Sequence, residues 1–156
     1  HATVGKTQAS MLRNHRPATA LQAKFSLEFA VACAFEGRKV GLAELTDNFV
    51  QQSDVQRIMS LVEISTVDSV CREEPTLAAS DRVVVELTDS RVLDTGEVFS
   101  TRGGIGQPLR ADELATKFFD CTAFSGDCSD LYAKLIQLHK LTDVAVLRLQ
   151  LDTLQN

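Results

Sequence analysis

The sequence is poor in several features that define special classes of protein. It has no tryptophan, one tyrosine and three prolines among 156 residues. Its longest unbroken apolar run extends only from Phe29 to Phe35, between Glu28 and Glu36, whereas a membrane-spanning helix needs about 20 apolar residues. Hydrophobic residues still make up 44% of the chain, which excludes a disordered protein. We therefore predict a soluble globular domain.

An excess of positive charge is also absent. The 16 basic and 21 acidic residues give a net charge of −5, whereas a general nucleic-acid binder needs a basic face. We expect neither a nucleic-acid nor a membrane partner. The charge is uneven, because residues 1–40 carry a net +4 and residues 41–156 a net −9. A locally basic segment attracts small anions, and a solvated surface is the alternative interpretation.

The four cysteines follow no pattern typical of a metal or redox site. Cys33, Cys71, Cys121 and Cys128 form no C-x-x-C pair, and no histidine lies at zinc-ligand spacing from them. We expect no metal. Cys33 lies in an apolar helical stretch and Cys121 follows two phenylalanines, so both are predicted to be buried thiols. No secretory leader is recognisable, and we expect a cytoplasmic protein.

Periodicity predicts a mixture of strands and helices arranged in separate blocks. The expected strands cover residues 2–12, 61–67, 82–88 and 92–100. The expected helices cover residues 20–35, 42–51, 53–59, 111–124, 128–139 and 142–154. This order favours an α+β fold over residues 1–156, a two-layer sandwich in which a small, mainly antiparallel sheet packs against helices in a single domain.

Local signals mark several expected helix ends and turns. Thr19-Ala20-Leu21-Gln22 and Ser53-Asp54-Val55-Gln56 both fit a capping box, which predicts a helix start at each place. Gly37 suits a left-handed position at the end of the first helix. Asp89-Ser90 predicts a tight turn between the last two strands.

Two motifs invite a chemical interpretation. The run Gly103-Gly104-Ile105-Gly106 lacks the spacing and the Lys-Ser/Thr of a phosphate loop, so we predict only a connecting loop. His15 is different, because it lies in the basic loop Arg13-Asn14-His15-Arg16-Pro17 just before a helix start. Two arginines and a histidine at that place could clamp a carboxylate. The alternative is a solvated loop whose arginines pair with neighbouring acids.

The remaining histidines are expected to have no chemical role. His139 lies near a helix end, where a cation suits the helix dipole, and His1 is terminal. The chain therefore lacks a recognisable set of nucleophile, base and orienting group.

A series of motifs resembles one known family. Residues 15–32 resemble the pattern R-P-x-T-x-x-x-A-K-F-S-x-x-Y/F-x-V-A of the MmgE/PrpD family, which includes 2-methylcitrate dehydratases, cis-aconitate decarboxylases and iminodisuccinate epimerases. Further similarity occurs in residues 40–47, 55–62, 87–91, 102–109 and 113–121. The motifs follow the family's order across nearly the whole chain.

The resemblance implies part of a two-domain enzyme. The chain resembles the smaller C-terminal lid domain, and the helical domain that supplies most acid–base residues would lie outside it. It implies a cofactor-independent enzyme, a homodimer when intact, and an inactive isolated chain without catalytic residues of its own. The substrate would be a small di- or tricarboxylate, with His15, Arg16, Lys24 and Ser26 as its contacts in this chain.

The sequence departs from the family pattern at three places. No tyrosine precedes Arg16-Pro17, although some members have one there, which favours a different substrate or subgroup. Ser90 replaces a turn glycine, and Arg110 replaces a Ser/Thr helix cap at a cost of about 1 kcal/mol. A 2-methylcitrate dehydratase-like lyase is the first expectation. The alternatives are a decarboxylase-like or epimerase-like activity, or a stand-alone anion-binding or interaction domain.

Overall fold

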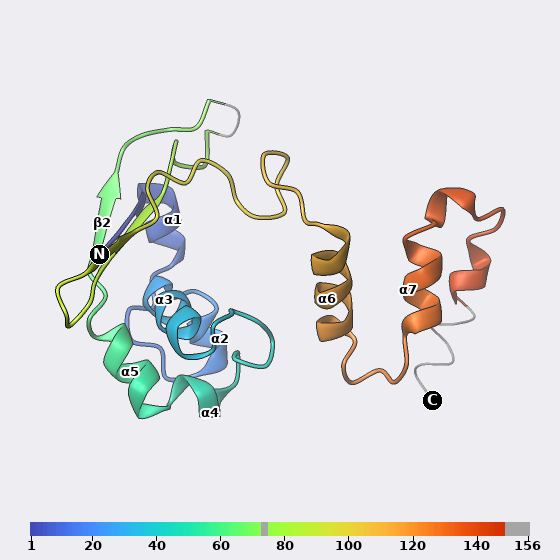
Figure 1. Ribbon diagram of the computed structural model, residues 1–156, viewed down its shortest axis with the longest axis horizontal. Helices are drawn as coiled ribbons and strands as arrows, with labels where there is room; N and C mark the ends of the chain where they lie inside the picture. Colours follow the sequence, from blue (N-terminus) through green and yellow to red (C-terminus); the bar gives the residue numbers. More distant parts are fainter. Residues whose placement is uncertain (73–74, 149–156) are drawn as a thin grey trace. The chain divides into compact units, whose positions relative to one another are not determined.

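A computed structural model of the chain describes residues 1–72 and 75–148 (Figure 1). The chain divides into two compact units, His1–Gln107 and Pro108–Asn156, which we call the first and second units. The single-domain organisation expected from the sequence stays a prediction. The expected helix 142–154 lies partly outside the described residues, and within them residues 145–148 are helical.

The first unit contains a four-stranded sheet with strand order β2-β1-β3-β4. Its strands are β1 (Ala2–Gly5), β2 (Ile64–Val67), β3 (Arg82–Glu86) and β4 (Val92–Asp94). Strand β1 pairs in parallel with β2 and antiparallel with β3, and β3 and β4 form an antiparallel hairpin. Two of the three pairings are antiparallel, so the α+β fold with a mainly antiparallel sheet is confirmed.

The strand expected over residues 2–12 is much shorter than predicted. It ends at Gly5, and α1 (Lys6–Met11) follows directly. Strand β1 is an inner strand of the sheet rather than an exposed one, and Ala2 and Val4 are buried. A Cβ atom at Gly5 would lie 2.8 Å from the Ala78 Cβ, so the close approach of the loop around Ala78 requires glycine at the strand end.

Helices of the first unit enclose its main apolar core. They are α2 (Ala20–Ala23), α3 (Leu27–Glu36), α4 (Asp47–Val50) and α5 (Ser53–Met59). Helix α3 packs against α5. The buried core residues are Ala23, Phe29, Ala32, Cys33, Val50, Val55 and Met59, so the predicted burial of Cys33 is confirmed.

The single helix expected over residues 20–35 is in fact two helices. Thr19 Oγ1 accepts a hydrogen bond from Gln22 N, which confirms the first cap. The chain then breaks before Ser26, which is extended at φ −132° and accepts from Phe29 N to start α3. The Phe25 carbonyl accepts instead from Asn14 N. A backbone contact with a distant loop therefore interrupts a continuous apolar stripe.

Other helix ends differ from the sequence prediction by a residue or more. Gly37 is right-handed at φ −85°, and Arg38 takes the left-handed position at φ 57°. Helix α5 begins at Ser53 itself, so the Ser53 hydroxyl does not cap it. The helix expected over residues 42–51 shrinks to α4, capped by Thr46. The predicted turn is confirmed, with Ser90 at φ 65°.

The second unit is helical in its described part. It contains α6 (Ala111–Cys121), α7 (Ser129–Leu135) and the 3₁₀ turn η1 (Leu138–Lys140). The rings of Phe118 and Phe119 both pack against Tyr132, with centroid distances of 5.1 and 5.3 Å. Cys121 is exposed at the end of α6, so its predicted burial is wrong, because α6 has no fully buried face in its unit. No helix in the described residues is long and apolar enough to cross a membrane.

Candidate functional site

The loop before α2 is held by contacts on both sides of His15. Asn14 N donates to Phe25 O at 3.0 Å, and the Asn14 side-chain amide donates to Gln22 O at 2.9 Å. On the other side, Pro17 is fully buried and its carbonyl accepts from Gln56 Nε2 at 3.2 Å. The backbone around His15 is therefore anchored to α2 and α5. These contacts fix the position of the Cα atom from which the His15 side chain extends.

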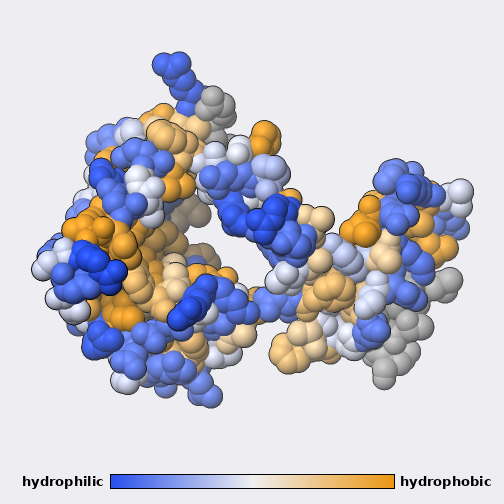
Figure 2. Space-filling model, viewed as in Figure 1, coloured by the Kyte–Doolittle hydropathy of each residue, from blue (hydrophilic) through white to orange (hydrophobic). Residues whose placement is uncertain are grey.

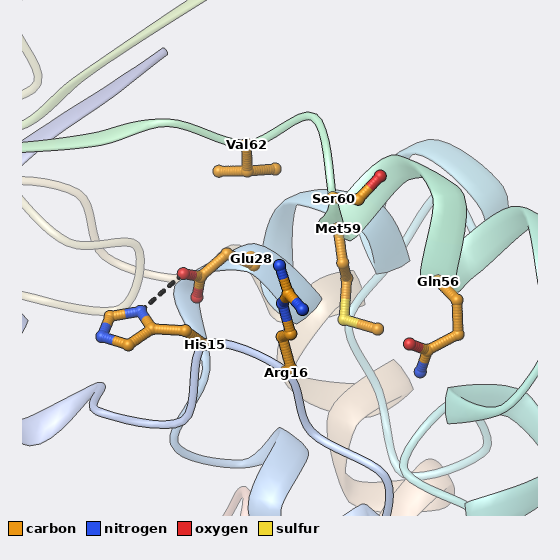
Figure 3. A pocket seen from close by; sticks show the side chains of 7 residues that line it. All are labelled: His15, Arg16, Glu28, Gln56, Met59, Ser60 and Val62. Atoms are coloured by element: carbon orange, nitrogen blue, oxygen red, sulfur yellow. Dashed lines mark hydrogen bonds and ion pairs between the residues drawn. The ribbon is translucent and has the colours of Figure 1, made fainter.

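An open pocket of about 420 Å³ lies between this loop and the helices α3 and α5 (Figure 3). Its lining combines one cationic side chain, one carboxylate, one imidazole and neutral groups. The lining residues are His15, Arg16, Glu28, Gln56, Met59, Ser60 and Val62. The pocket is thus built from three separate segments of the first unit.

His15 and Glu28 form a close pair at the edge of this pocket. His15 Nδ1 lies 2.7 Å from Glu28 Oε1, and Figure 3 shows the ring turned toward that carboxylate. The pair is asymmetric, because the Glu28 side chain is 7% exposed and the His15 side chain 67% exposed. Glu28 Oε2 also accepts a hydrogen bond from Ser26 Oγ at 3.3 Å. A buried carboxylate therefore holds an exposed imidazole.

Arg16 has its guanidinium in the same pocket, between Glu28 and Met59 in Figure 3. Among the described residues, no hydrogen bond or ion pair involves its side chain. The sequence alternative of an arginine paired with a neighbouring acid therefore does not describe Arg16, and His15 takes the acidic partner instead. An unpaired guanidinium can bind a carboxylate through two parallel hydrogen bonds.

The other two predicted contacts lie elsewhere. Lys24 is exposed at the end of α2, and Ser26 is buried at the start of α3. Both line a smaller, mostly apolar pocket of about 200 Å³. The structure therefore brings His15 and Arg16 together and places Lys24 and Ser26 on a different pocket. Substrate contact by any of the four stays a prediction.

Glu28 belongs to the site but was not identified from the sequence. A signal was present, because Glu28 lies three residues after Phe25 and four before Ala32, on the apolar face of the helical stretch. An acid on such a face is buried and needs a partner. The sequence could not name that partner, since His15 lies in a loop whose course depends on tertiary contacts.

The groups with the largest pKa shifts lie outside this pocket. Burial, with a smaller contribution from Glu44, raises the pKa of the Cys33 thiol to about 11. Hydrogen bonds from the Arg82 side chain and from the Gly96 N–H lower the pKa of Asp94 to about 2. Within the described residues, no three His, Cys, Asp or Glu side chains are grouped to hold a metal ion.

The other two histidines and the glycine run, for which the sequence predicts no chemical role, lie outside the pocket that contains His15. His1 Nε2 lies 2.9 Å from Ser65 Oγ beside the sheet, and His139 lies in η1. The glycine run forms a connecting loop, as predicted, in which Gly103 takes φ 90° and its N–H donates to Gln107 O at 2.7 Å.

Fold and site together define an α+β protein in which one pocket combines an imidazole with a guanidinium that has no partner among the described residues. The family model of the MmgE/PrpD C-terminal domain matches residues 1–141. The chain therefore belongs to the MmgE/PrpD family, and the resemblance drawn from its motifs is confirmed. The family is generally enzymatic. No curated protein matched the sequence.

Proposed function

We propose that this chain is the lid of an MmgE/PrpD-like enzyme that acts on a small di- or tricarboxylate. The observation that carries the proposal is that Arg16, which lines the same open pocket as His15, has a guanidinium without a partner in the part of the chain that the structure describes. A guanidinium without an internal partner is available to an external anion, and its planar fork matches a carboxylate. Lys24, also exposed, adds to the positive charge of residues 1–40.

The proposed reaction is a dehydration of the 2-methylcitrate dehydratase kind. A base removes the proton from the carbon next to a carboxylate, and the electrons of that C–H bond form a carbon–carbon double bond. The C–O bond at the neighbouring carbon breaks, and the hydroxyl leaves as water after it receives a proton. The acid and base would belong to the helical domain. The lid binds the carboxylate and excludes water.

An apolar groove in the first unit supports the lid interpretation. It has a volume of about 550 Å³, and valines of β3 and side chains of α3 and α5 line it. Its apolar lining includes Val84, Ile58 and Leu61. Figure 2 shows apolar side chains gathered on the first unit. Exposed apolar patches of this kind mark interfaces. We propose that the enzyme's own helical domain is a partner of this lid and that the intact enzyme is a cytoplasmic homodimer.

The proposal leaves the isolated chain without turnover, because the acid and base are assigned to another domain. Decarboxylation or epimerisation of a related carboxylate would use the same anion contacts and the same proton abstraction. A stand-alone anion-binding domain would use the contacts without any reaction. Turnover of the intact enzyme separates these alternatives.

Binding is tested on the chain itself with citrate as the probe. In a titration followed by NMR, we expect citrate to shift the resonances of His15 and the Arg16 side chain, and Arg16→Ala to weaken binding about 10-fold or more. Arg91→Ala is the matched control, because this substitution removes the same positive charge from another part of the chain. Arg91 pairs with Asp89 in the hairpin turn. Equal weakening by both variants, or shifts confined to other residues, would refute Arg16 as the anion contact.

A further inference from the structure

Glu28 is a buried carboxylate with one ionisable partner. Its side chain is 7% exposed, and the only ion pair that the described residues give it is with His15. Burial of an unpaired carboxylate is strongly unfavourable, so the contact with His15 is required by the position of Glu28. The free-energy cost of burying Glu28 is therefore offset only when the His15 imidazole is oriented toward its carboxylate.

The start of α3 does not need this carboxylate. Ser26 Oγ already accepts from Phe29 N at 3.1 Å and satisfies the helix start. An acid in the first helical turn also suits the helix dipole, but an exposed acid would serve equally well. Glu28 instead turns one oxygen to Ser26 and the other to His15. Helix capping therefore does not explain why the Glu28 side chain is buried or why its carboxylate points toward His15.

We propose that Glu28 is a positioning residue that fixes the ring and the tautomer of His15, a role that rests on the function proposed above. A carboxylate accepts hydrogen bonds only, so Nδ1 of His15 must carry the proton in the 2.7 Å contact. In the neutral ring, Nε2 then has a free lone pair. Figure 3 shows this second nitrogen on the side of the ring that faces away from Glu28 and from the other side chains drawn.

The fixed tautomer gives His15 a defined chemistry toward a ligand lying on this surface. The neutral ring accepts a hydrogen bond or a proton at Nε2, and the protonated ring donates from Nε2 to an anion. Arg16, the next residue, supplies a permanent cation in the same pocket. Anchoring of the loop at Asn14 and Pro17 keeps the ring from turning with the backbone.

The tautomer is read from the imidazole nitrogen shifts of the full chain in a long-range ¹H–¹⁵N correlation spectrum at alkaline pH. We expect His15 in the Nδ1–H form, and His139, which lies exposed in η1, mainly in the Nε2–H form that free side chains prefer. This measurement needs no variant. A wild-type His15 in the Nε2–H form would overturn the proposal.

Variants test whether Glu28 is the cause. Glu28→Met removes the acceptor but keeps the length of the side chain, and we expect His15 to change to the mixture shown by His139. Ser26→Ala is the matched control, because it removes the cap and the second contact of Glu28 but leaves the carboxylate. We expect Ser26→Ala to keep the Nδ1–H form. Retention of the Nδ1–H form in Glu28→Met would refute a positioning role for Glu28.

Failure of this proposal can be distinguished from failure of the proposed function. If His15 has the Nδ1–H form but citrate shifts neither His15 nor Arg16, the positioning role stands and carboxylate binding fails. If citrate binds but the tautomer is Nε2–H, the proposed function stands and the role of Glu28 is refuted.

Discussion

Breaking the His15–Glu28 pair from either side should have unequal effects on stability. His15→Ala leaves a carboxylate that is 7% exposed without its ionisable partner. Glu28→Met removes the buried charge instead, and leaves an imidazole that is 67% exposed and therefore solvated. Replacement of a buried ion by an apolar side chain of similar size is often close to neutral, whereas removal of its partner is not. We therefore expect His15→Ala to be the more destabilising change.

The magnitude follows from the exposure of the two side chains. Breaking a fully buried pair costs about 3–5 kcal/mol, and a surface pair contributes about 0–1 kcal/mol. With one partner buried and the other exposed, we expect His15→Ala to lower the free energy of unfolding by about 2 kcal/mol. Glu28→Met should cost about 0–1 kcal/mol. In the double variant no charge remains to be stranded, so its cost should be close to that of Glu28→Met alone.

Urea unfolding followed by far-UV circular dichroism measures the free energy of unfolding of the wild type, the two single variants and the double variant. A cost of about 2 kcal/mol corresponds to a fall in Tm of about 4–8 °C for a chain of this size. His139→Ala is a matched control for loss of an exposed imidazole and should stay within about 0.5 kcal/mol of wild type. A larger cost for Glu28→Met than for His15→Ala would refute the reasoning, as would strictly additive costs.

Two further predictions concern groups with shifted pKa values. The pKa of Asp94 is near 2 in the folded chain and 3.8 ordinarily, so its ionised form stabilises the hairpin above about pH 4, and this contribution disappears as the pH falls toward 2. Carboxyl NMR titration should find that midpoint, and Arg82→Ala should raise it toward 3.8; an ordinary midpoint in wild type would contradict the assignment. For the thiols, burial and a pKa of about 11 should protect Cys33 from iodoacetamide at pH 8, while exposed Cys121 is alkylated first. Peptide mass spectrometry reads the order, and preferential modification of Cys33 in the folded chain would contradict its burial.

Local signals were sufficient for the parts of the fold that depend on near neighbours. The Thr19 cap bonds to a residue three positions away, and the turn at Ser90 joins adjacent strands. The break before Ser26 could not be predicted in the same way, because the apolar stripe continues through it. What interrupts the helix is the bond from Asn14 N to the Phe25 carbonyl, a contact that only the folded loop provides.

The sequence likewise predicted only the part of the candidate site that depends on residues near one another in the chain. His15 and Arg16 are adjacent in the sequence, so the basic loop alone brings them together. Lys24 and Ser26 were grouped with them on the strength of the family motif, but the helix break places both on another pocket. Glu28 was missed because its role depends on the partner that the loop places 2.7 Å away.

The central claim is that His15 and Arg16 bind the substrate carboxylate, and turnover by the intact enzyme tests it most directly. Small di- and tricarboxylates should be assayed with wild type, with His15→Ala/Arg16→Ala and with the control Arg91→Ala. The account predicts that the double variant loses about 10- to 100-fold or more in kcat/KM, from the loss of a charge-assisted hydrogen-bonded contact, while the control keeps wild-type turnover. Normal turnover in the double variant would contradict the claim.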